Sequence, residues 1–188
     1  TDEEVRAFQA DADPAKRDRV IDRLLESPAY ADYFANKWNL VLRNKKRGNE
    51  DAAGTYGFHR WIWNSLYTNK PYDQFVQEQL AGDLMPETAD LKTTFERWTA
   101  TGFLSLGAKM LADDDPVKMQ MDIVDEQLDT AARTFMGLTV GCARCHDHKF
   151  DPIPAADYYA MAGIFKSSKT MENFKVVAKW HEYVLAPE

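Results

Sequence analysis

The segment from Asp113 to Leu138 constrains the fold more than any other part of the sequence. Asp115 can cap a helix, and Pro116 suits its first position, because proline lacks the amide hydrogen that would be unpaired there. Apolar side chains then recur in alternating steps of four and three, at Val117, Met121, Val124, Leu128, Ala131 and Phe135. This spacing predicts a long amphipathic helix with one buried face, in a chain that folds mainly from helices.

Similar signals for the start of a helix recur in other parts of the sequence. Helices are predicted to begin at Asp13–Pro14, at Ser27–Pro28, near Phe58 and at Pro71, and a helix interrupted by glycines is predicted over 94–111. Residues 50–57 are expected to form a loop. In the second of these helices the expected buried face is Phe34, Trp38 and Val41. A short helix should follow Pro154, and the tail 174–188, rich in valine and aromatic side chains, is expected to contain a short extended segment.

Composition excludes several classes of function. The chain has 188 residues and a formal net charge of -7, which is unsuited to nucleic acid, because phosphate contact needs clustered lysine and arginine. No apolar run approaches the ~20 residues that cross a bilayer, so the chain is not expected to span a membrane. The opening TDEEVRAF is polar and acidic, which we interpret as the start of a mature or excised piece rather than a signal peptide.

The decapeptide GCARCHDHKF, from Gly141 to Phe150, holds both cysteines of the chain and two of its four histidines. Three chemistries use such a cluster. A c-type haem needs two thiols that add to its vinyl groups and an imidazole beside them, the pattern C-x-x-C-H formed by Cys142, Cys145 and His146. Zinc could take the same three side chains with His148 as a fourth ligand. A redox dithiol would use the cysteines alone.

The spacing favours haem and leaves the other two chemistries open. Structural zinc sites usually draw their second pair of ligands from a separate segment, whereas here His146 follows Cys145 directly and the chain has no third cysteine. A thioredoxin-like dithiol normally opens a helix after a strand, whereas a long predicted helix precedes this motif.

The motif and its flanks resemble a known family. GLTVGCARCHDHKFDPIPAADYYAMAGIFKSS is similar to the planctomycete-type cytochrome c family, a domain of unknown function found in large secreted or periplasmic proteins. Three upstream blocks also resemble the family's segments, in the same order: RDRVIDRLLESPAYADYFANKWNLVLRN, FHRWIWNSLYTNKPYDQFVQEQLAGDL and ATGFLSLGAKMLADDDPVKMQMDIVDEQLDTAARTFMGLTV. The resemblance covers about residues 11–185.

The resemblance implies a haem c held by Cys142 and Cys145, with His146 as the proximal iron ligand and maturation outside the cytoplasmic membrane. We therefore expect residues 1–188 to form one helical domain around a single covalent haem, as a fragment or subunit of a larger periplasmic or extracellular protein or complex. Its partners would be redox proteins or other domains of the same complex. The resemblance does not assign a chemical reaction to this domain.

The second axial ligand decides how the iron behaves. His59 is the first candidate for the distal position, because it lies on a predicted helix beside an aromatic face; His181 and Met110 are the alternatives, and an open iron is the remaining one. His148 is expected instead to bond a haem propionate or the loop backbone, since it lies too close to His146 to reach the distal face.

Three hypotheses of function follow. The first is an electron-transfer domain, which makes the chain an electron carrier rather than a catalyst. The second is a haem-dependent redox enzyme with an open distal site. The third is a structural module, in which the covalent haem stabilises a helical domain of a larger complex.

Overall fold

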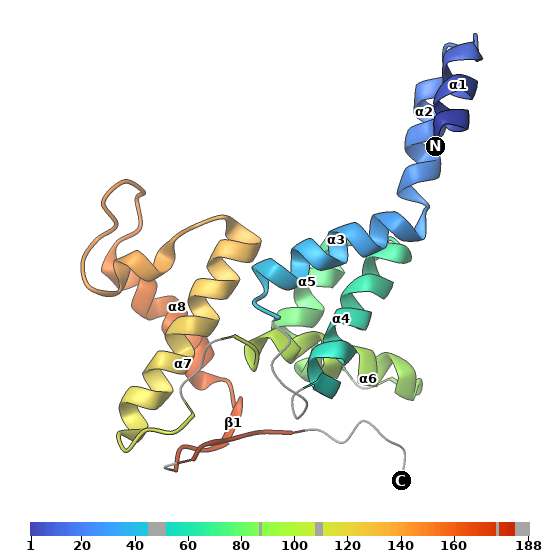
Figure 1. The fold of residues 1–188 in the computed structure, drawn as a ribbon. Coiled ribbons are helices and arrows are strands. Elements are labelled where there is room, and N and C mark those ends of the chain that lie inside the picture. Colours follow the sequence, from blue (N-terminus) through green and yellow to red (C-terminus); the bar gives the residue numbers. More distant parts are fainter. Residues whose placement is uncertain (45–51, 87, 108–110, 176, 183–188) are drawn as a thin grey trace.

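The computed structural model describes residues 1–44, 52–86, 88–107, 111–175 and 177–182. This part of the chain is mainly helical, as the sequence predicts, and contains eight α-helices and a small two-stranded antiparallel sheet (Figure 1). None of these helices has both the length and the apolar character that crossing a membrane requires.

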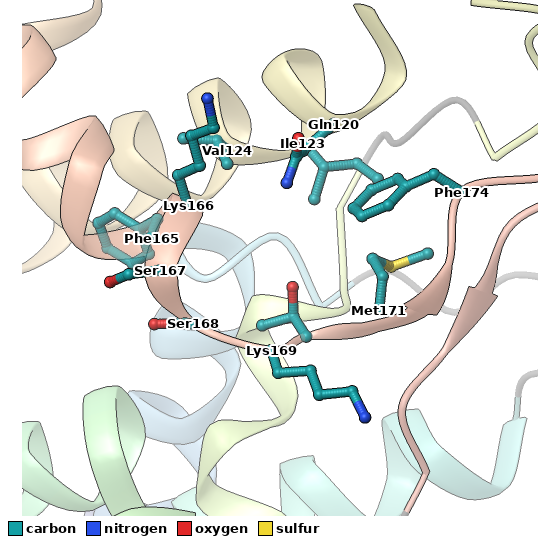
Figure 2. Close-up of a pocket in the computed structure, with 11 residues that line it drawn as sticks. Gln120, Ile123, Val124, Phe165, Lys166, Ser167, Ser168, Lys169, Met171 and Phe174 are labelled. Carbon is teal, nitrogen blue, oxygen red and sulfur yellow. The ribbon is translucent and has the colours of Figure 1, made fainter. Parts of the chain in front are cut away.

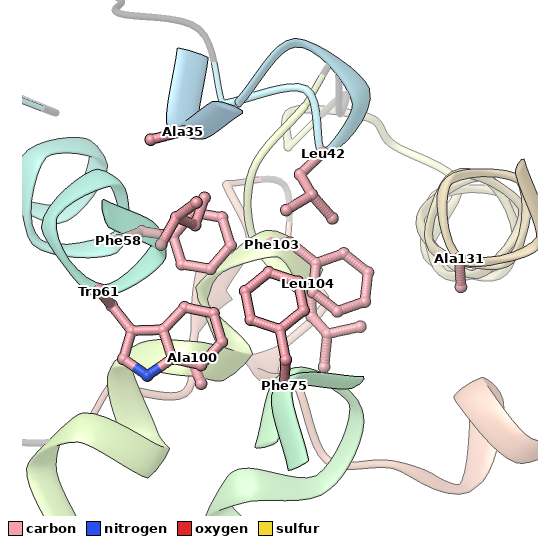
Figure 3. Packing of buried hydrophobic residues seen from close by; sticks show 10 residues of the cluster. Ala35, Leu42, Phe58, Trp61, Phe75, Ala100, Phe103, Leu104 and Ala131 are labelled. Atoms are coloured by element: carbon pink, nitrogen blue, oxygen red, sulfur yellow. The ribbon is translucent and has the colours of Figure 1, made fainter. Parts of the chain in front are cut away.

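In the first half of the chain, helices α3 to α6 surround an aromatic core, and α1 and α2 precede them. The elements of this half are α1 (Asp2–Ala10), α2 (Lys16–Leu25), α3 (Pro28–Val41), α4 (Ala52–Tyr67), α5 (Tyr72–Ala81), α6 (Leu91–Ala100) and the 3-10 turns η1 (Gly82–Leu84) and η2 (Thr101–Leu104). Figure 3 shows Phe58, Trp61, Phe75 and Phe103 converging from α4, α5 and η2. Trp61 stacks on Phe75 with ring centroids 5.1 Å apart. This packing fixes α4 and α5 against each other.

The second half carries the cysteine motif. Its elements are α7 (Pro116–Ala131), a π-helical turn (Ala132–Met136), the 3-10 helix η4 (Val140–Arg144), α8 (Ala155–Ser167), β1 (Met171–Asn173) and β2 (Lys179–Trp180). Asp115 caps α7 as predicted, since its carboxylate accepts hydrogen bonds from the amides of Val117 and Lys118. In Figure 1, α7 and α8 lie side by side, and the chain between them forms a long loop at one end of the pair.

The exit from α7 sets the position of the motif. Gly137 adopts a φ of 68°, the left-handed conformation that ends helices at low cost only when no Cβ is present. The chain therefore turns at Gly137 and enters η4 after three residues, with Val140 and Ala143 buried under the loop. The helix that the apolar pattern predicts from Val117 to Phe135 is thus confirmed, but its last turn, Ala132–Met136, is π-helical, and the chain leaves it at Gly137.

Several expectations were wrong. Residues 52–57 belong to α4 rather than to a loop, and α1 is a helix that the sequence analysis did not predict. Asp13 does not cap a helix starting at Pro14; its carboxylate accepts a hydrogen bond from the Ala15 amide, and α2 begins at Lys16. In α3 the buried side chains are Ala31 and Ala35 rather than Phe34 and Val41, because small residues allow α3 to lie close to α4.

Candidate haem-attachment site

The 3-10 helix η4 turns the two cysteine side chains outward. Side chains three residues apart lie on the same side of a 3-10 helix. Val140 and Ala143 therefore share the inner side, where they are 1% and 0% exposed and pack with Leu128. Cys142 and Cys145, also three residues apart, are both exposed and free of any disulfide. The fold thus presents two accessible thiols on a single short turn.

His146 follows on the same exposed turn, and its ring is oriented by the backbone. Its Nδ1 lies 2.7 Å from the carbonyl oxygen of Asp147. A carbonyl only accepts hydrogen bonds, so this contact places the proton on Nδ1 and leaves the lone pair on Nε2. A metal-binding histidine commonly donates its other ring N–H to a backbone carbonyl in this way. Cys142, Cys145 and His146 therefore fit the donor set of a c-type haem.

His148 has a different environment from His146. Its Nε2 lies 2.9 Å from Oγ1 of Thr139, and its Nδ1 accepts a hydrogen bond from the Asp151 amide at 2.8 Å. Both ring nitrogens are thus used to hold the loop, which is the backbone role expected for this residue. The described residues also contain no group of three histidine, cysteine or carboxylate side chains placed to hold a metal ion. This geometry gives a zinc site no fourth ligand.

The loop after the motif is closed by side chain to backbone bonds. The Asp147 carboxylate accepts a hydrogen bond from the Ala155 amide at 2.8 Å, at the first turn of α8. The amide of His148 donates to the carbonyl of Ile153 at 2.9 Å. The haem motif is therefore tied directly to the start of α8.

Arg144, between the two cysteines, fastens the motif to α7 and α8. Its guanidinium lies 3.0 Å from the carboxylate of Asp125 on α7. The buried hydroxyl of Tyr158 donates to the same carboxylate at 2.6 Å, and Tyr159 donates to the Arg144 carbonyl at 2.9 Å. Burial, and then the hydrogen bond to Asp125, raises the pKa of Tyr158 above its usual range. The turn bearing the thiols is thus held at its middle by two helices.

This arrangement predicts the effect of removing one hydroxyl. Tyr158→Phe should lower the free energy of unfolding by about 1–3 kcal/mol, because the Asp125 carboxylate loses a buried hydrogen bond. Urea denaturation at neutral pH measures the change. Tyr159→Phe is the matched control, since the Tyr159 ring is 56% exposed and its hydroxyl can be replaced by water. An equal loss in both variants would show that Asp125 does not depend on Tyr158.

A charged hollow of about 420 Å³ lies beside Cys142, with Arg43 and Arg133 among its lining residues. Arg43 follows α3 with a φ of 57° and contacts the carboxylate of Asp129 on α7 at 2.6 Å. Arg133 contacts the same carboxylate at 2.7 Å. A Cβ at Gly141 would come within 3.0 Å of Asp129, so glycine allows the motif to lie close to α7. The hollow places two guanidinium groups next to the Cys142 thiol.

The sequence analysis missed this charged cluster, although a signal for it was present. Asp122, Asp125, Glu126 and Asp129 follow each other on α7 at steps of three, one and three, which places them along one side of a helix. All four line the hollow beside Cys142. Arg43 and Arg144 come from other elements, so only the fold could identify them as partners. Arg133, in contrast, pairs with Asp129 at a step of four that the sequence already shows.

The structure does not bring His59 together with the motif. His59 lies on α4 and lines a hollow with Asp32 and Trp63 that shares no lining residue with the hollow beside Cys142. Asn39 Nδ2 lies 2.5 Å from Nδ1 of His59 and also donates to the Ala35 carbonyl. This contact makes Nδ1 the acceptor and places the proton on Nε2. Iron ligation by His59 therefore requires a change in this hydrogen bonding.

The alternatives for the distal ligand are also placed away from η4 or lie outside the described residues. His181 follows β2, and its Nδ1 is 3.4 Å from the carboxylate of Glu172 near β1. Met110 lies outside the described part of the chain. The distal ligand remains a prediction.

A further hollow, of about 220 Å³, lies between α7, the end of α8 and β1 (Figure 2). Ile123, Phe165 and Phe174 give it apolar walls, and Lys166 and Lys169 also line it. Neither cysteine nor His146 is among the side chains around it.

Comparison with known proteins agrees with the resemblance seen in the sequence. The model of the family PSCyt2, described as a protein of unknown function (DUF1549), matches residues 1–170. No curated protein and no solved structure matches the chain. The match spans most of the chain, including Cys142, Cys145 and His146, and so the chain belongs to the PSCyt2 family of planctomycete cytochrome-like domains.

Proposed function

We propose that this chain is a c-type cytochrome domain that carries one haem on Cys142 and Cys145, with His146 as the proximal ligand, and transfers electrons outside the cytoplasm. The observation that carries the proposal is the exposed turn itself. Cys142 on η4 and Cys145 directly after it both expose a free thiol, and the next side chain offers an unprotonated Nε2. When bound, haem supplies a one-electron couple at iron.

The protein's own residues would hold and orient the haem. Arg144, Asp125 and Tyr158 fix the turn that bears the thiols, and the Asp147 carbonyl sets the ring of His146. Arg43 and Arg133 lie beside Cys142 and are paired with Asp129, in a hollow that four carboxylates of α7 also line, and the formal net charge of the chain is -7. The acidic charge favours a basic redox partner, and docking to it should weaken as ionic strength rises.

A second function is favoured by one specific observation. Asn39 holds His59 in the tautomer whose Nε2 carries a proton, which is unsuited to iron ligation. If no other side chain takes the distal position, the iron has an open site, and the domain would be a haem-dependent redox enzyme that binds a small molecule there.

The absorption spectrum of the haem-loaded protein separates these two functions. For an electron carrier we expect low-spin iron in both oxidation states and a reduced spectrum that carbon monoxide does not change. A high-spin reduced form that binds carbon monoxide would overturn the electron-carrier proposal and support the enzyme.

The variants His59→Gln and His181→Gln then test the predicted distal ligands. Loss of the low-spin spectrum in one variant alone identifies that residue as the ligand. A spectrum unchanged in both variants contradicts both histidine assignments.

A further inference from the structure

Helices α1 and α2 have few contacts with the rest of the molecule. Figure 1 shows them side by side, standing away from the other helices beyond the start of α3. They have nine and ten residues, and none of these residues is buried. Isolated helices shorter than about 12–15 residues are marginal in water and depend on packing against an apolar surface. Within the described chain, this pair lacks such a surface.

The pair nevertheless carries large apolar side chains. Val5 on α1 and Ile21, Leu24 and Leu25 on α2 are between 44% and 56% exposed. The three residues of α2 are spaced three and four apart, so they share one side of the helix. A hollow of about 330 Å³ also remains between the helices, with Phe8 and Val20 among its lining residues.

The two helices carry opposite charge. The segment α1 has three carboxylates and one arginine, whereas α2 has four basic side chains and two carboxylates. Some of these charges already pair within the chain, as Arg23 does with Glu4 at 3.5 Å and Arg19 with Asp11 at 2.6 Å. Glu3 and Arg17 form no ion pair within the described part of the molecule. After these ion pairs, Glu3 therefore leaves an unpaired negative charge on α1, and Arg17 leaves an unpaired positive charge on α2.

We infer that two copies of this chain associate through α1 and α2 as a four-helix bundle, in which α1 of each copy lies against α2 of the other. A two-fold axis brings the same surface of both copies together, so that surface must complement itself. An acidic helix next to a basic helix meets this condition. Around the bundle the order is α1, α2, α1 and α2, and each acidic helix has a basic helix on both sides. The apolar stripe is covered in the centre, as in other four-helix bundles.

Light scattering after size-exclusion chromatography of the full chain tests the inference. We expect a dimer of the 21.5 kDa chain, and Leu24→Glu should weaken its dissociation constant by about tenfold or more. Leu84→Glu is the matched control, because Leu84 is 78% exposed on η1 and should not affect the dimer. A wild-type chain that stays monomeric at every concentration, or a dimer that survives Leu24→Glu, overturns the inference.

Two charge reversals test the pairing of α1 with α2. Glu3→Arg and Arg17→Glu should each weaken the dimer, because each reduces the charge difference between facing helices. A mixture of the two variants should form a heterodimer more readily than either variant forms a homodimer. In the heterodimer, one of the two α1–α2 contacts between copies joins an unchanged acidic α1 to an unchanged basic α2. Failure of the mixture to associate better contradicts this arrangement.

Hydrogen exchange of the wild-type chain provides a test without substitutions. The amides of α1 and α2 should become more protected as protein concentration rises, while those of α4 stay unchanged. Protection of α1 and α2 that does not depend on concentration overturns the inference.

Discussion

Replacing both Cys142 and Cys145 with alanine is expected to abolish covalent haem attachment. Both thiols are exposed and free, and they are the only cysteines of the chain, so no other side chain can form the thioether bonds. The variant, produced with a cytochrome c maturation system, should lose all haem on a denaturing gel stained for haem peroxidase activity. Each single variant should keep one point of attachment and show a weaker stain.

The structure also predicts what this double variant retains. Because Val140 and Ala143, rather than the cysteines, fill the inner side of η4, the variant should keep the helical circular dichroism of the haem-free wild-type chain. Lys149→Ala, at an exposed position in the same loop, is the control and should stain normally. Haem that survives denaturation in the double variant would contradict attachment at these cysteines. A partner activity unaffected by haem loss would remove the electron-transfer function and favour the structural module.

The second large effect concerns the packing beneath the motif. Leu128 is fully buried on α7 and contacts the cluster that contains Val140, Ala143 and Tyr158. Leu128→Ala should lower the free energy of unfolding by about 2–5 kcal/mol, because it removes buried apolar volume and leaves a cavity that its neighbours fill only in part. Urea denaturation of the haem-free chain measures the loss.

Val117→Ala is the matched control for Leu128→Ala. Val117 was predicted to belong to the same apolar face, but it lies in the first turn of α7 and is 68% exposed. Its replacement should change the free energy of unfolding by no more than about 0.5 kcal/mol. Equal losses at the two positions would show that the buried cluster does not support the motif.

The sequence predicted several features that depend on neighbouring residues, although it missed α1 and misplaced the start of α2. Asp115 and Pro116 mark the start of α7 because capping is a local interaction, and Pro154 does the same for α8. The motif was identified from the spacing of Cys142, Cys145 and His146 alone, and the family match supports that reading. The extended segment predicted within 174–188 is confirmed by β2, whereas its partner β1 precedes that range and was not predicted.

Features that depend on distant contacts were missed or misjudged. Phe34 and Val41 were expected inside because they are large and apolar, yet the close approach of α3 to α4 is made by Ala31 and Ala35. The tautomer of His59 could not be predicted from the sequence, because it depends on a hydrogen bond from Asn39, 20 positions away. The contact of Arg144 with Asp125 likewise joins residues on separate elements.

Intact mass spectrometry of the full chain, after production with a cytochrome c maturation system and denaturation, tests the central claim most directly. The account predicts the mass of the chain plus one haem, and after proteolysis the added mass should lie on the peptide that contains Cys142 and Cys145. An unmodified chain whose cysteines both remain reactive towards alkylating reagents would contradict it.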